Sequence, residues 1–204
     1  MISSDPTNLE AVWKCEACGE SISAEKIGLV TRAVKEAGEN LDATPKIEDF
    51  EAYLKKYASV LHQNHCIMID RKYTLAKMYG RMKGYEPDEM TDEQFQRKRQ
   101  LCTEVLNVLD KIMPGRSRKR GMIKYELHLP LVMLSNRNLQ RGPSCGVPPE
   151  KLKEDLQNGL LNLKEALDIL SDEPEGSFEH KIVLGSKESV TQLEDWVKTV
   201  CSSI

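Results

Sequence analysis

Residues 148–170 read PPEKLKEDLQNGLLNLKEALDIL, a run in which leucine returns every three or four positions. This spacing places the leucines on one face of an α-helix. The stripe consists of Leu152, Leu156, Leu160, Leu163, Leu167 and Leu170. Two prolines open the segment, where the first turn of a helix tolerates a missing N–H, and Pro174 follows it. The run therefore predicts an amphipathic helix that buries its stripe against other helices.

The same periodicity continues towards both ends of the chain. Thr91 and Gln94 have the spacing of a capping box, Pro114-Gly115 predicts a helix end, and Pro130 should kink the helix that contains it. The predicted helices cover residues 23–39, 46–61, 62–81, 91–113, 117–138, 148–173 and 178–200.

The pattern predicts an all-α fold, because no convincing strand alternation interrupts the helical segments. Helices of this length joined by short breaks favour antiparallel pairs, stacked in a tetratricopeptide-like bundle or a short superhelix. Residues 1–22 lack helical periodicity and are predicted to form a short cysteine-containing loop, which leaves residues 23–204 as the helical domain.

Composition narrows the class of protein. The 204 residues include 29 Lys and Arg against 32 Asp and Glu, and the net charge of −3 gives no general attraction to nucleic acid or anionic lipid. No apolar run approaches the roughly 18 residues that span a bilayer, and the N-terminus lacks the features of a signal peptide. We therefore expect a cytoplasmic or nuclear protein that does not enter membranes.

Cys15 and Cys18 form the one recognisable cysteine motif, CEACG. Two thiolates at this spacing can hold one zinc ion, but a closed structural site needs four ligands. The chain has no second such pair, and His62 and His65 lie far along the sequence. The motif is therefore either part of a zinc site that His62 and His65 complete or a pair of free thiols in a loop, and the long separation favours free thiols for this chain alone.

A basic cluster lies between the fourth and fifth predicted helices. Its candidate partner-binding residues are Arg116, Arg118, Lys119 and Arg120. Such a cluster could hold an acidic peptide or phosphate. However, residues 150–179 contain nine acidic and three basic side chains, so pairing within the chain is the main alternative. No aromatic residues interleave with the bases, which argues against nucleic acid.

A series of ordered motifs covers nearly the whole chain. It comprises Trp13 to Cys18, Tyr57 to His65, Tyr79-Gly80-Arg81, Gly84-Tyr85, Pro114-Gly115, Arg120-Gly121-Met122 and Tyr125 to Leu131. Together these motifs resemble the C-terminal half of the SET-and-MYND-domain (SMYD) proteins, especially their arthropod-specific branch.

The resemblance implies a fragment of a protein-lysine methyltransferase. In that family a MYND zinc finger and a SET domain precede a cysteine-rich segment and a helical C-terminal domain. Cys15 and Cys18 match the later of two cysteine pairs, so zinc would need ligands outside this chain. The S-adenosylmethionine motifs are absent, and no catalytic or cofactor-binding residue transfers.

We therefore expect a domain that is not an enzyme alone, that shapes the substrate groove of its parent and that binds protein partners. The alternative is a free-standing helical-repeat adaptor for acidic or C-terminal peptides.

Overall fold

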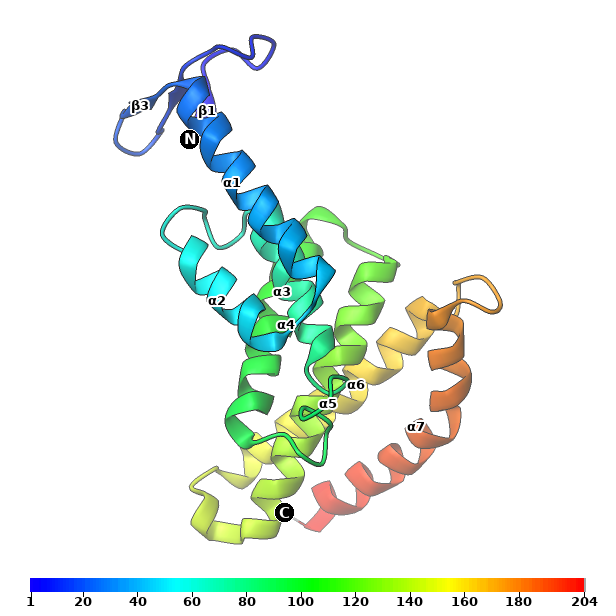
Figure 1. Cartoon of the computed structure of the whole chain (residues 1–204). Coiled ribbons are helices and arrows are strands. Elements are labelled where there is room, and N and C mark those ends of the chain that lie inside the picture. The colour runs from blue at the N-terminus through cyan, green and yellow to red at the C-terminus, as the bar shows by residue number, and fades with distance from the viewer. Residues whose placement is uncertain (204) are drawn as a thin grey trace. The chain divides into compact units, whose positions relative to one another are not determined.

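The structure, a computed structural model, describes residues 1–203, and seven α-helices lie within them (Figure 1). This confirms the predicted all-α class. The helices are α1 (Ala24–Ala43), α2 (Ile47–Tyr57), α3 (Cys66–Met78), α4 (Asp92–Ile112), α5 (Arg118–Arg141), α6 (Pro149–Leu170) and α7 (Phe178–Ser203), with a short 3-10 helix η1 (Gly142–Cys145) after α5. None of the helices in this described part is long and apolar enough to cross a membrane.

The chain divides into two compact units, Met1–Leu61 and the remainder from His62 onward. In the first unit, α1 and α2 are tied by the hydroxyl of Tyr53, which donates to the Val34 carbonyl at 2.9 Å. Residue 22, the predicted end of the N-terminal segment, is the last residue of a strand, and α1 begins two residues later.

The sequence analysis predicts that residues 1–22 form a loop, but the structure places short strands within this loop. The segment contains three antiparallel strands in the order β1 (Ile2–Ser3), β2 (Trp13–Lys14) and β3 (Ser21–Ile22). Each strand is two residues long. Alternation of apolar and polar residues needs at least four positions to be recognised, so these strands leave no signal in the sequence.

In the second unit, each helix from α3 to α6 packs on the next one along the chain, and α6 packs on α7 (Figure 1). The α5–α6 interface is the most extensive. Two glycines explain its closeness: a Cβ at Gly159 would lie 2.9 Å from Val132 Cγ2, and one at Gly121 would lie 2.9 Å from Ile169 Cγ2. Sequential packing of this kind agrees with the predicted stacking of antiparallel pairs.

The helix limits follow local chemistry. Thr91 and Gln94 form the predicted capping box of α4. By contrast, α3 begins at Cys66 instead of residue 62, because the His65 side chain accepts the N–H of Ile67 and caps the helix there. The helix α5 continues through Pro130 to Arg141.

The leucine stripe of α6 supplies a large part of the core. Leu152, Leu156, Leu163 and Leu170 are buried, while Leu160 and Leu167 are half-buried. The stripe therefore faces the neighbouring helices as predicted.

Candidate functional site

The basic residues named from the sequence gather where the α4–α5 connection meets α6 and α7. Arg116 lies in the connection, and its Nε contacts Asp172 Oδ2 at 2.5 Å, while its Nη1 pairs with Asp168. The Arg116 guanidinium lowers the pKa of the Asp172 carboxyl. All three side chains are about half exposed or more, so each pair contributes little to stability.

Arg118 and Arg120 lie in the first turn of α5 and are also paired. The Nε of Arg118 donates to Glu179 Oε1 at 2.8 Å, and this carboxylate is buried at the start of α7. The Nε of Arg120 donates to Asp110 Oδ1 at 2.7 Å. Three of the four named cations therefore bind acids of their own chain. This is the pairing within the chain that the sequence analysis gives as the main alternative to partner binding.

Lys119 differs from its neighbours. No ion pair involves it among residues 1–203, and its Nζ lies 5.8 Å from the centre of the Tyr73 ring. Burial raises the pKa of the Tyr73 phenol to about 12, and the negative charge of Glu126 acts in the same direction. The ring is therefore uncharged and presents its face to the lysine.

Lys119 and Tyr73 line a groove of about 490 Å³ between α3 and α4. Its apolar wall consists of Ile67, Ile69, Val105, Val108, Leu109, Ile112 and Met113. Ile112 remains 66% exposed although it belongs to this wall. A second hollow continues on the other side of Val108 and Ile112, and Lys111 lines it. The groove thus combines exposed apolar surface with Lys119, and Lys111 lines the adjoining hollow.

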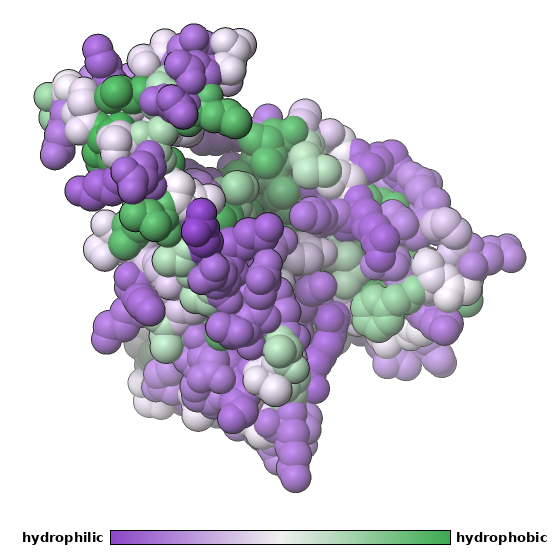
Figure 2. Space-filling model, turned by 45° about the horizontal axis from the view of Figure 1, so that its top comes forward, coloured by the Kyte–Doolittle hydropathy of each residue, from purple (hydrophilic) through white to green (hydrophobic). Residues whose placement is uncertain are grey.

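On the face drawn in Figure 2, hydrophilic residues cover most of the molecule and hydrophobic patches interrupt them.

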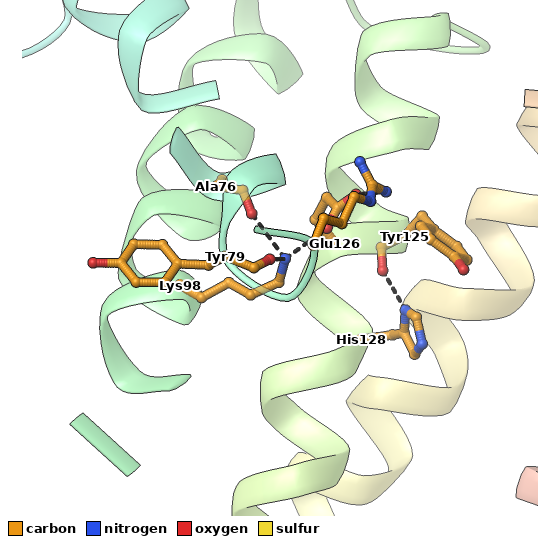
Figure 3. Close-up of polar contacts among 7 residues, drawn as sticks. Ala76, Tyr79, Lys98, Tyr125, Glu126 and His128 are labelled. Atoms are coloured by element: carbon orange, nitrogen blue, oxygen red, sulfur yellow. Dashed lines mark hydrogen bonds and ion pairs between the residues drawn. The ribbon is translucent and has the colours of Figure 1, made fainter. Parts of the chain in front are cut away.

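A buried polar cluster joins α3, α4 and α5, and the sequence analysis did not find it. Lys98 is fully buried, and its Nζ donates to the carbonyls of Ala76 at 2.8 Å and Tyr79 at 2.7 Å (Figure 3). Its third contact is Glu126 Oε2 at 2.6 Å. The other oxygen of Glu126 pairs with Arg81. All three ammonium donors of Lys98 are thereby satisfied, as a buried charge requires.

The signal for this cluster was present in the sequence. Lys98 shares the buried face of α4 with Phe95, Leu101, Cys102 and Val105, at helical spacing. A charged residue on an apolar stripe predicts a buried partner. The sequence analysis did not single out Lys98, which lies between two arginines in a basic run.

The cysteine motif forms the turn between β2 and β3. The amide of Gly19 donates to the Cys15 carbonyl at 2.8 Å, and Gly19 has a φ of +73°. Hydrogen bonds from the backbone amides of Cys18 and Ala17 lower the pKa of the Cys15 thiol. Amides directed at sulfur are typical of metal-binding turns, so Cys15 and Cys18 fit half of a zinc site.

Further metal ligands do not join them within the described part of the chain. No group of three or more His, Cys, Asp and Glu residues there has the geometry to hold a metal ion, and all six cysteines are unpaired thiols. His62 and His65 use their Nδ1 atoms to accept backbone N–H groups at the entrance to α3.

Comparison with family models, curated proteins and solved structures produced no match to this chain.

Proposed function

We propose that this chain is the helical C-terminal domain of a SET-and-MYND-type protein-lysine methyltransferase, and that it binds protein segments in the α3–α4 groove. The observation that carries the binding role is the apolar groove of about 490 Å³ beside Lys119. The family assignment rests on the ordered motifs in the sequence. In this proposal the domain supplies a wall of the substrate groove and performs no chemistry alone.

The chemistry of the groove indicates the kind of segment that it would accept. Apolar side chains of a partner would cover Val108 and Ile112, and burying them would favour association. Lys119 and Lys111 would attract carboxylates at the edge of the contact. Arg116, Arg118 and Arg120 would have to exchange internal ion pairs for a partner, so the two lysines are the better candidates for the charged contact.

Site-specific photo-crosslinking tests the groove. A photoreactive amino acid would replace Ile112 in the groove or Leu161 on α6, two exposed positions with 66% and 51% exposure. We expect a discrete crosslinked protein from position 112 in the source cells, and its loss when Lys111 and Lys119 are both changed to Glu. Identical crosslinking patterns at both positions would contradict a specific groove.

The family assignment has a separate test. Transcript mapping upstream of the Met1 codon should find an in-frame region that encodes SET motifs. A stop codon preceded by a promoter would instead support the free-standing adaptor for acidic or C-terminal peptides.

The isolated chain is further expected not to bind S-adenosylmethionine, because the sequence lacks the SET motifs that hold it. Titration calorimetry measures this directly. A micromolar binding isotherm would contradict the assignment to the C-terminal domain alone.

A further inference from the structure

A second cavity, separate from the α3–α4 groove, lies between α5 and the start of α7. It has a volume of about 400 Å³. Its walls include Arg81, Lys98, Tyr125, Glu126, His128 and Phe178. Figure 3 shows the side chains of Lys98, Glu126 and His128 in this region, with Tyr125 beside His128. The proposed function makes no use of these residues.

The charges around the cavity do not cancel. Lys98 and Arg81 are both cationic, and Glu126 is the acid that pairs with them. Only Nη2 of Arg81 takes part in that pair; its other guanidinium N–H groups have no partner among residues 1–203, and its side chain is 35% exposed. The cavity therefore retains a net charge of +1 and unused donors that suit a carboxylate.

His128 adds an acceptor of defined orientation. Its Nδ1 contacts the Tyr125 carbonyl, which can only accept a hydrogen bond, so Nδ1 carries the proton (Figure 3). Burial lowers the pKa of this imidazole to about 4, which keeps the ring neutral near pH 7. The lone pair then resides on Nε2, which has no partner within the described residues and is not sealed from solvent. Nε2 can therefore accept a hydrogen bond from a ligand that displaces water.

Aromatic surface completes the site. The Arg81 guanidinium lies 5.6 Å from the centre of the Phe178 ring, and the Tyr125 and His128 ring centres are 5.0 Å apart. These side chains give the cavity an aromatic wall beside its charged groups.

We propose that the α5–α7 cavity binds a small aromatic carboxylic acid that carries a hydroxyl group. The carboxylate binds the free N–H groups of Arg81, the hydroxyl donates to Nε2 of His128, and the ring lies among Tyr125 and Phe178. This site is independent of partner binding in the α3–α4 groove.

Titration calorimetry with the full chain tests the site with three probes of similar size. The first, 4-hydroxyphenylacetate, offers both polar groups; phenylacetate lacks the hydroxyl, and tyrosol lacks the carboxylate. We expect one molecule of 4-hydroxyphenylacetate per chain and at least about 10-fold weaker binding of each of the other two, because each lacks one hydrogen-bonding group and one such bond contributes about 1 kcal/mol.

Two variants assign the contacts. His128→Asn keeps a donor for the Tyr125 carbonyl but removes the acceptor Nε2. This variant should bind 4-hydroxyphenylacetate only as tightly as the wild type binds phenylacetate. Its affinity for phenylacetate should not change. Arg81→Gln should abolish binding of both acids. Arg141→Gln is the matched control, because Arg141 is likewise an exposed arginine in an ion pair, with Asp92 at 2.5 Å, and lies outside the cavity.

Circular dichroism would verify that each variant remains folded, and Phe178→Ala offers a second route should Arg81→Gln unfold. Phe178 is 56% exposed, so its removal should lower the affinity for the two acids without unfolding the chain. Absence of binding by the wild-type chain would overturn the proposal, as would equal affinity for all three probes. Binding that is unaffected by both His128→Asn and Phe178→Ala would also overturn it.

Discussion

At the residue scale, the most consequential side chain is Lys98. It holds the C-terminal end of α3 through two carbonyls and α5 through Glu126. Replacing two buried charges with apolar groups can be neutral, but removing one partner leaves the other uncompensated. Removing one charge of the cluster should therefore destabilise the fold more than removing both charges.

Lys98→Met should lower the free energy of unfolding by about 3–5 kcal/mol, because Glu126 would keep only the partly exposed Arg81 as a counter-charge. Urea denaturation followed by circular dichroism measures the loss. The exposed Lys111→Met is the control and should change the stability by less than about 0.5 kcal/mol. A loss below about 1 kcal/mol for Lys98→Met would show that the cluster is not a structural element.

His128 should make stability depend on pH. Its pKa is about 4 in the folded chain and near 6.5 in the unfolded chain, since burial disfavours the charged ring. Above pH 6.5 both states are neutral; as pH falls from 6.5 towards 4, the unfolded state takes up a proton first and stability is lost. Between pH 7 and 5 this amounts to about 2 kcal/mol.

Thermal or urea unfolding at pH 7, 6 and 5 would reveal this dependence. In His128→Asn the contribution should disappear, so the variant should lose about 2 kcal/mol less than the wild type over that interval. Parallel pH curves for the two proteins would mean that folding does not lower the pKa of His128.

At the element scale, α6 is the helix on which the second unit depends. It packs on both α5 and α7, and its glycine at position 159 allows the α5 backbone to approach closely. The face that carries Leu163 is buried, while Leu161, two positions earlier, is 51% exposed. The two leucines differ in burial but not in residue type.

Leu163→Ala should therefore lower the free energy of unfolding by about 2–5 kcal/mol, because it leaves a cavity between packed helices. Leu161→Ala on the same helix should cost less than about 0.5 kcal/mol. Urea denaturation of the pair provides the comparison. Equal losses of stability at both positions would show that the core does not lie on the Leu163 face of α6.

At the scale of the whole molecule, the metal content of the N-terminal unit distinguishes half a zinc site from a complete one. Cys15 and Cys18 supply two of the four ligands of a tetrahedral ion. We expect the purified chain to hold less than one zinc per molecule, as measured by elemental analysis. One tightly bound zinc per chain, released by Cys15→Ser, would instead show that a second molecule or a distant histidine completes the site.

The sequence by itself determined which segments are helical and which face of each is apolar. The leucine stripe of α6 and the capping box of α4 act within one or two helical turns, so local periodicity and local hydrogen bonds were sufficient to predict them. The short strands of residues 1–22 could not be predicted, because two residues are too few to show an alternation of apolar and polar side chains.

Only the tertiary structure decided which charges meet. Arg118 and Glu179 are 61 positions apart, and Lys98 and Glu126 are 28 apart. Sequence could indicate that the basic and acidic segments attract each other, but not that Lys119 alone of the four named cations would line an apolar groove. That outcome depends on how α3, α4 and α5 pack, because side chains from separate helices become neighbours only when the helix interfaces bring them together.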